Sequence, residues 1–270
     1  MHRERPEKRL RKGHFSRFSC AVTIFVLIYI VSAIGAIVYG GAVHFGDAIA
    51  DKEVLFALRL SSTTAFISTS LCLFLAVPVA YALTYVDFRG KKFIEIMLEL
   101  TLSLPYILIG IALLILFSSP VGRLLESMGV KVVFTSVGIV FAQLTVNLPF
   151  AIRLARTGFA SLDQRWQFIA YALGASEMRY FFRIVLPNAR RSLTTAFITV
   201  FSRAMGEFGA TLMLVGITRL KTETLPGAIY LAVSTGNTNM AMSIAIIMLL
   251  VSALSLFISN LIGKEKKEGE

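Results

Sequence analysis

Histidine, tryptophan and cysteine are scarce in this sequence of 270 residues, which has three, one and two of them. The histidines are scattered without the spacing of metal ligands. Cys20 and Cys72 both lie in apolar runs, so neither a disulfide framework nor a metal site is indicated. A Gly-x-x-x-x-Gly-Lys-Ser/Thr phosphate-binding loop is also missing, so the chain cannot supply its own ATP site. We therefore expect no cofactor, no metal and no catalytic residues in this chain.

Charged residues are also few, at 16% of the chain, where a soluble domain carries roughly 25%. Hydrophobic residues make up 56%, and the mean hydropathy is +0.74. Because the charges are clustered, apolar runs of about twenty residues or more remain, enough to cross a hydrocarbon core of roughly 30 Å. The sequence predicts an all-α, polytopic integral membrane protein.

Six transmembrane helices are expected, joined by short polar loops. Their approximate ranges are 18–43, 58–86, 93–118, 132–152, 192–217 and 239–262. The first run is too long for the apolar part of a signal peptide, so we interpret it as an uncleaved span. Pro78, Pro105 and Pro149 predict kinks, and the apolar stretch 225–233 predicts a short interfacial or re-entrant helix. The domain organisation is then a basic tail (1–17), one transmembrane domain (18–262) and a charged tail (263–270).

Lysine and arginine are distributed unequally between the two sides of this topology. With the N-terminus inside, the four inner segments hold seven, three, seven and three of them, or 20 of the 27 in the chain. The opposite side holds six, and Arg203 lies inside a span. The positive-inside rule therefore places both termini and the segment 161–187 in the cytoplasm. This asymmetry also explains the net charge of +11, so no nucleic-acid partner is expected.

Segment 161–187 is a polar, basic interruption between long apolar spans. Ser161 and Gln164 predict a capping box at the start of a helix. One apolar face of that short amphipathic helix follows at i, i+3 and i+7: Trp166, Ile169 and Leu173. Gly174 predicts its C-terminal end, and Pro187 suits the first turn of the next helix, where a missing N–H costs little.

The same segment carries a motif, Ala170-x-x-x-Gly174, nine residues, then Ile184-x-Leu186-Pro187. It resembles the "EAA" loop of the permease subunits of ABC importers. The chain departs from the family pattern at Phe168 and Ile169, where the family has Glu and Ala. An ordinary cytoplasmic loop helix is the alternative interpretation.

In that family the loop folds as a coupling helix that docks into a cleft on the ATPase subunit. The resemblance therefore implies an ATPase-coupling set in this chain: Trp166, Ala170, Gly174, Ala175, Ile184, Leu186 and Pro187. It also implies a homodimer of permeases, an ABC ATPase dimer that binds ATP and Mg²⁺ on the cytoplasmic side, and an extracytoplasmic solute-binding protein. The location implied is the lipid membrane of a prokaryotic cell.

A second resemblance covers residues 206–216 and 222–226, which look like the fifth-span signature of molybdate and tungstate permeases. Gly206 and Gly209 would let backbones approach closely, and Thr211 offers a hydroxyl group. Nothing in that chemistry selects molybdate. The substrate class implied is a tetrahedral oxyanion, with a sulfate or thiosulfate permease as the alternative.

Arg203 and Glu207 are the only charged residues predicted deep inside a span. Being four residues apart, they would lie on one helix face and could pair. Either they form a structural ion pair, or they line a hydrated path between two copies of the chain, because buried charges face protein or water. The candidate path residues are Ser103, Asn147, Arg203, Glu207 and Thr211.

Two other function classes remain as alternatives. An ion-coupled secondary carrier needs intramembrane acidic groups, and Glu207 is the only deep one. A membrane enzyme needs a nucleophile–base or metal cluster at membrane depth, and no histidine is predicted deep in a span.

Overall fold

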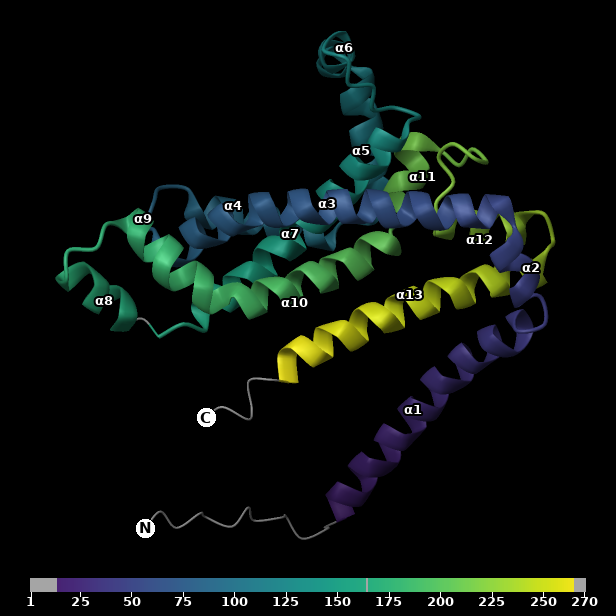
Figure 1. Cartoon of the computed structure of the whole chain (residues 1–270), viewed down its shortest axis with the longest axis horizontal. Helices are drawn as coiled ribbons and strands as arrows, with labels where there is room; N and C mark the ends of the chain where they lie inside the picture. Colours follow the sequence, from purple (N-terminus) through teal and green to yellow (C-terminus); the bar gives the residue numbers. More distant parts are fainter. Residues whose placement is uncertain (1–13, 164, 265–270) are drawn as a thin grey trace.

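The computed structural model describes residues 14–163 and 165–264, and every regular element in these ranges is a helix (Figure 1). The predicted tails 1–17 and 263–270 fall largely outside the described residues. The described chain has four single helices long and apolar enough to cross a membrane. They are α1 (His14–Gly41), α3 (Lys52–Tyr85), α7 (Ser136–Ala160) and α13 (Thr238–Lys264).

Two further spans are possible if each is built from two helices joined at a bend. Helices α4 (Lys91–Ser103) and α5 (Tyr106–Ser118) meet at 111°. The continuous helix Glu177–Met205, which includes α10 (Leu186–Met205), meets α11 (Gly209–Val215) at 56°. The described residues thus hold four to six candidate spans. The shorter elements are α2 (Phe45–Ala50), α6 (Pro120–Ser127), α8 (Arg165–Ala172), α9 (Glu177–Tyr180), the π-helical turn η1 (Phe181–Val185) and α12 (Leu225–Ser234).

Pro105 breaks its span rather than bending it, so the prediction of one helix over 93–118 is wrong. The residue before it, Leu104, has extended backbone angles (φ −74°, ψ 139°), because a proline ring disfavours the α conformation at the preceding position. Pro78 and Pro149, by contrast, lie inside α3 and α7, which stay helical. The prediction of a short helix near 225–233 is confirmed by α12.

Helices α3 and α7 lie side by side at the centre of the molecule (Figure 1). Small buried residues line this contact and let the two backbones approach: Ser68, Cys72, Ala76 and Ala80 on α3, and Ala151 and Ala155 on α7. Gln143 ties α10 to this pair. Its Oε1 accepts a hydrogen bond from Ser68 (2.9 Å) and its Nε2 donates to the carbonyl of Ala204 (3.0 Å).

Helix α1 lies apart from the other helices except near its C-terminal end, where it approaches α13 (Figure 1). There Ser243 donates to the carbonyl of Gly41 (2.8 Å). Most of the apolar side chains of α1 are exposed in the single chain. An apolar helix of this length, exposed on nearly all sides, is suited to a lipid environment or to a neighbouring chain.

At Gly110, α5 approaches α11 closely. A Cβ atom added there would lie 2.6 Å from the carbonyl oxygen of Ala210 and 2.8 Å from the Cβ of Met213. We expect Gly110→Ala to lower the free energy of unfolding by about 1–3 kcal/mol, because backbone atoms of α11 must move. Gly35→Ala is the matched control, since nothing lies within 4 Å of its added Cβ. Thermal unfolding of the two purified variants checks this, and equal midpoints would contradict the α5–α11 contact.

The loop between α11 and α12 holds a buried carboxyl group. Glu223 is 3% exposed, and its Oε2 has no hydrogen-bond partner among the described residues. The nearby Arg219 is engaged with Glu53 at 2.8 Å. Burial, together with the negative charge of Glu53, raises the pKa of Glu223 above its usual value.

Because the folded state raises this pKa, Glu223 favours stability at low pH and opposes it as the pH rises through the raised value. We expect Glu223→Gln, which carries no charge at any pH, to stabilise the protein more at pH 8 than at pH 5. Unfolding midpoints of wild type and variant across that range measure the difference. A difference that shrinks toward pH 8 would contradict the assignment.

Candidate functional site

The coupling segment, residues 161–187, lies at one end of the molecule, opposite α2 and α12 (Figure 1). Its helix α8 ends in a Schellman motif around Gly174, which has a φ of +77°. The amide of Ala175 donates to the carbonyl of Ala170 (2.9 Å), and the amide of Gly174 donates to the carbonyl of Tyr171 (3.0 Å). The predicted helix end at Gly174 is confirmed.

The start of α8 differs from the prediction. Ser161 is the C-cap of α7, and its hydroxyl donates back to the carbonyl of Gly158 (2.8 Å), so it does not begin the next helix. Asp163 takes that place, because its carboxylate accepts from the amide of Arg165 (2.9 Å). The cap therefore lies two residues later than the capping-box pattern indicated, and Gln164 lies outside the described residues.

Part of the coupling segment is buried against the long helices α3 and α7. Ala170, Tyr180 and Val185 are 5%, 1% and 0% exposed and belong to one core with α3 and α7. Ala175 and Ile184 pack against that core. The Tyr180 ring contacts those of Tyr85 and Tyr171, and burial raises the pKa of Tyr180. These contacts attach the segment firmly to the membrane helices.

Pro187 follows the π-helical turn η1 and occupies the first turn of α10, as predicted. Proline cannot donate a backbone hydrogen bond, and a π turn shifts the hydrogen-bond register just before it. The chain therefore runs as one bent helix from Glu177 to Met205. Leu186 is half-buried and Pro187 is exposed.

Several large apolar side chains of the coupling segment are exposed to solvent in the single chain. They are Trp166 (43% exposed), Phe168 (78%), Ile169 (53%), Leu173 (83%) and Met178 (69%). Phe168 occupies the position where the EAA pattern has Glu. Large apolar side chains exposed on one short segment, called the exposed patch below, are typical of a protein–protein contact surface.

Arg203 and Glu207 do not pair, and the prediction that they share one helix face is wrong. Helix α10 ends at Met205 with Gly206 as its C-cap, which places Glu207 in the break before α11. The Glu207 carboxylate accepts from the amides of Ala210 (2.8 Å) and Thr211 (3.1 Å) and from the Thr211 hydroxyl. It therefore satisfies the free N–H groups at the start of α11.

The Arg203 guanidinium lies against two aromatic rings instead. It is 5.4 Å from the ring centre of Tyr106 and 4.8 Å from that of Phe150, and it donates to the Tyr106 hydroxyl. The Nε atom of Arg203 is buried without a partner among the described residues. Sequence reasoning did not identify Tyr106 or Phe150, because aromatic residues in apolar spans give no distinguishing signal.

Of the other predicted path residues, Asn147 and Thr211 are buried inside the single chain, at 0% and 4% exposed. The Asn147 amide donates to the carbonyl of Gln143 (2.8 Å), and its Oδ1 has no partner in the described ranges. The structure brings Glu207 and Thr211 together, whereas Ser103 lies in a separate cavity. Their role in a path remains a prediction.

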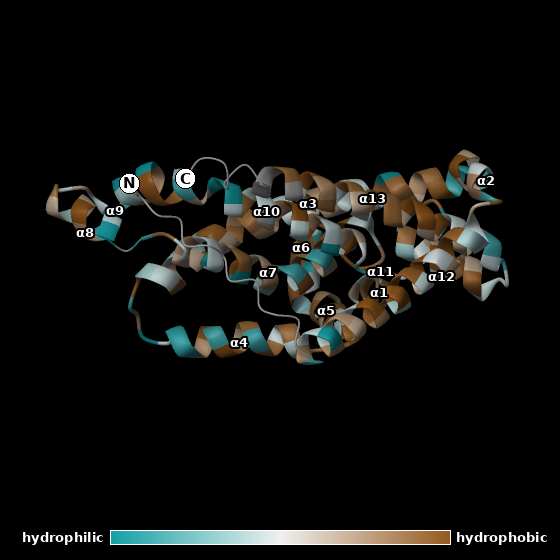
Figure 2. Cartoon of the chain, turned by 90° about the horizontal axis from the view of Figure 1, so that it is seen from below, coloured by the Kyte–Doolittle hydropathy of each residue, from teal (hydrophilic) through white to brown (hydrophobic). Residues whose placement is uncertain are grey.

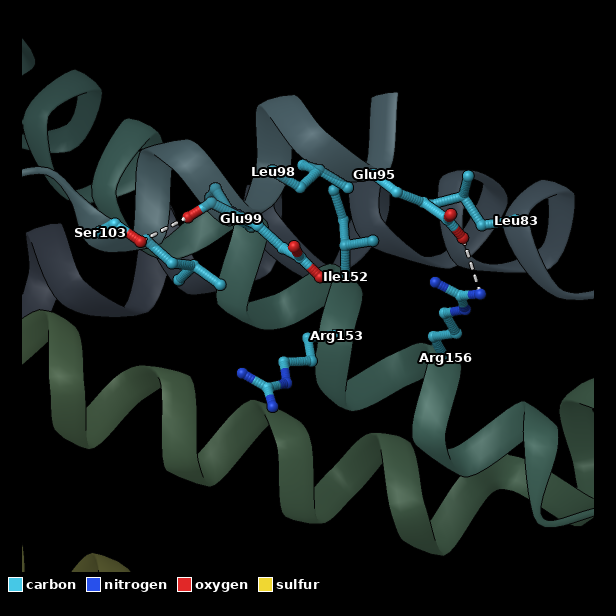
Figure 3. Close-up of a pocket in the computed structure, with 10 residues that line it drawn as sticks. Leu83, Glu95, Leu98, Glu99, Ser103, Ile152, Arg153 and Arg156 are labelled. Atoms are coloured by element: carbon cyan, nitrogen blue, oxygen red, sulfur yellow. Dashed lines mark hydrogen bonds and ion pairs between the residues drawn. The ribbon is translucent and has the colours of Figure 1, made fainter. Parts of the chain in front are cut away.

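That cavity, of about 390 Å³, lies between α4 and α7 (Figure 3). Its charged and hydroxyl groups are those of Glu95, Glu99, Ser103, Arg153 and Arg156. Arg156 forms an ion pair with Glu95 (2.8 Å), and Ser103 donates to the carbonyl of Glu99 (3.0 Å). Figure 2 shows mixed hydrophilic and hydrophobic residues along α4, which lies along one side of the molecule. These charges lie in two segments far apart in the sequence, and the fold brings them together.

Residues 72–267 match the family described as "Binding-protein-dependent transport system inner membrane component". The chain belongs to this family. Its members are transport components of the inner membrane, so this chain is a multi-pass membrane transport subunit and not a catalytic one.

Several curated relatives are similar over most of their length. A molybdate/tungstate transport system permease protein of Pyrococcus abyssi is 35% identical over 72% of this chain and 75% of its own. A probable transport system permease protein of Clostridium pasteurianum is 31% identical over 79% and 76%. A probable sulfate transport system permease protein of Chlorokybus atmophyticus is 32% identical over 81% and 77%.

Solved structures share the fold. A chain of a bacterial alginate ABC transporter, in complex with its periplasmic protein, superposes with a TM-score of 0.76 at 15% identity, covering 94% of this chain and 95% of its own. A chain of the MetNI methionine ABC transporter in an inward-facing conformation gives 0.64 at 14% identity, over 78% and 94%. The arrangement of helices is therefore that of ABC transporter membrane subunits.

A double-mutant cycle tests the separation of Arg203 from Glu207. Glu207→Ala leaves backbone donors of α11 unsatisfied and is expected to lower the free energy of unfolding by about 1–3 kcal/mol. Because Arg203→Gln acts on a different set of contacts, the double variant should lose the sum of the two single effects. Chemical unfolding of the four proteins measures these free energies. A large interaction energy between the two substitutions would contradict the separation and favour an Arg203–Glu207 ion pair.

Proposed function

We propose that this chain is the permease subunit of an ATP-driven importer of tetrahedral oxyanions, with molybdate and tungstate as its substrates. Two copies pair around a translocation path, and an ABC ATPase dimer with ATP and Mg²⁺ binds below them. A solute-binding protein delivers the oxyanion from outside. The chain contributes the path and the coupling surface, and the ATPase subunits contribute hydrolysis.

The coupling segment is the observation that carries this proposal. It combines a helix ended by a Schellman motif, buried packing through Tyr180 and Val185, and several exposed large apolar side chains. A cleft in an ATPase subunit would cover the exposed patch. The docking surface would depend on shape and apolar contact, because Phe168 replaces the family Glu.

The topology of the proposal has six spans and both termini in the cytoplasm. The bent pairs α4–α5 and α10–α11 each count as one span in this arrangement. The lysine and arginine asymmetry supports the orientation, which places the coupling segment on the side where ATP is available. A path on the two-fold axis of a homodimer is suited to subunits with so few spans.

The substrate assignment is supported by the permease relatives named above, among which molybdate/tungstate proteins recur. A sulfate or thiosulfate importer is the second candidate, because a sulfate permease is similar over a comparable share of the chain. An ion-coupled carrier is less well supported. The deep acidic group that such a carrier would use, Glu207, is occupied as the cap of α11.

Uptake of molybdate into proteoliposomes tests the proposal directly. We expect the complex with its ATPase and binding protein to accumulate molybdate only when ATP is supplied on the cytoplasmic face. Gly174→Ala should reduce this uptake and weaken co-purification of the ATPase, because an alanine at a φ of +77° strains the backbone by about 1–2 kcal/mol.

Gly236→Ala is the matched control, since Gly236 has a φ of +78°, equally open surroundings and a position at the other end of the molecule. It should leave uptake and ATPase binding unchanged. Uptake driven by an ion gradient without ATP would overturn the importer proposal, and equal effects of the two glycine variants would overturn the coupling role.

A further inference from the structure

Four charged side chains of the α4–α7 cavity are spaced as two matching pairs. Glu95 and Glu99 are four residues apart on α4, and Arg153 and Arg156 are three apart on α7. Residues at these spacings lie on one face of a helix, one turn from each other. Glu95 therefore opposes Arg156, and Glu99 is the next carboxylate along α4, on the side of Arg153 (Figure 3).

Only one of these two pairs is joined. Arg156 and Glu95 form an ion pair at 2.8 Å, with side chains 42% and 29% exposed. Glu99 and Arg153 also line the cavity and are exposed, but no ion pair in the described part of the chain includes either of them. The cavity thus contains an uncommitted guanidinium group, with an uncommitted carboxylate on the opposite helix.

The surroundings of Arg153 suit a tetrahedral oxyanion. A guanidinium presents paired N–H donors that match two oxygens of such an ion, and it gives up its hydration more readily than an ammonium group. The Ser103 hydroxyl in the same cavity already donates to the carbonyl of Glu99 (3.0 Å), so the guanidinium is the donor that the cavity offers. The cavity is also at the end of α7 that leads into the coupling segment, since α7 ends at Ala160.

We propose that Arg153 is an oxyanion contact at the cytoplasmic end of the translocation path, and that Glu99 competes with the oxyanion for it. This inference rests on the proposed function. While the Glu99–Arg153 pair is open, Arg153 holds the oxyanion. When α4 and α7 move together, Glu99 takes the guanidinium and the oxyanion is released. The Glu95–Arg156 pair keeps the two helices in register during this exchange.

A phosphate headgroup of an anionic lipid offers the same tetrahedral chemistry as molybdate. Lipid is also a neighbour to consider at this cavity, because the opposite face of α4 is apolar and exposed. The experiment must therefore separate cargo from lipid. Binding of labelled molybdate to the purified permease is measured in nanodiscs of phosphatidylcholine alone and in nanodiscs with added phosphatidylglycerol. We expect molybdate to bind to the wild-type permease in both kinds of nanodisc.

Arg153→Gln should weaken molybdate binding about tenfold or more, because a charge-assisted contact is lost. Arg191→Gln, which removes an exposed arginine outside the cavity, should bind as wild type does. Glu99→Gln should bind molybdate several-fold more tightly and transport it more slowly in proteoliposomes, because the competitor for Arg153 is gone. A gain in affinity cannot arise from misfolding, so this variant keeps the test decisive.

Three results would overturn the inference. The first is that Arg153→Gln and Glu99→Gln both bind molybdate as wild type does. The second is that Glu99→Gln binds molybdate more weakly than wild type. The third is that phosphatidylglycerol displaces molybdate from wild type but not from Arg153→Gln. The last would assign the site to a lipid headgroup. In each case ATP-driven uptake by the wild-type complex would leave the proposed function intact, whereas a wild-type complex without such uptake would refute that function independently.

Discussion

The attachment of the coupling segment to the membrane helices is the contact on which the proposed transport cycle depends. Tyr180 and Val185 are almost fully buried against α3 and α7, and Ala170 brings α8 into the same core. Close-packed interiors transmit displacement instead of absorbing it. A partner that moves the exposed patch on α8 must therefore also move the helices to which these residues are packed.

Two helices carry such a displacement toward the predicted path. The coupling segment continues without interruption into α10, which ends beside the Glu207 turn, and it follows directly from α7. Gln143 joins α7 to α3 and α10 by hydrogen bonds, so the three helices are linked at membrane depth. Helices α4 and α5 are two separate helices, because the chain bends by 111° at Pro105.

Much of the fold could be predicted from the sequence, because long apolar runs and clustered charges are strong signals. Gly174 and Pro187 also specified their local structure correctly, since their backbone restrictions act locally. At Pro105 a kink was predicted but the end of the helix was not, and the break at Gly206 was not predicted, because hydropathy does not distinguish a continuous helix from two joined ones. For the same reason, the helical spacing of Arg203 and Glu207 suggested a pair that the break separates.

The cavity was missed because its charges lie near the ends of two spans that are far apart in the sequence. Charges are expected at the ends of apolar spans, so Glu95, Glu99 and Arg153 do not stand out individually in the sequence. A complementary spacing of acidic and basic residues on two predicted helices is the signal that could have identified them. It becomes informative only when the fold places α4 beside α7.

The central claim is that the coupling segment takes mechanical work from a separate ATPase and passes it to a paired path. The distance between spin labels placed on Leu173, which is 83% exposed at the tip of α8, tests this most directly in a complex whose Cys20 and Cys72 are replaced by serine. The account predicts two labels per complex whose separation shortens when ATP binds. A separation unchanged by ATP, in a complex that hydrolyses ATP and transports molybdate, would contradict it.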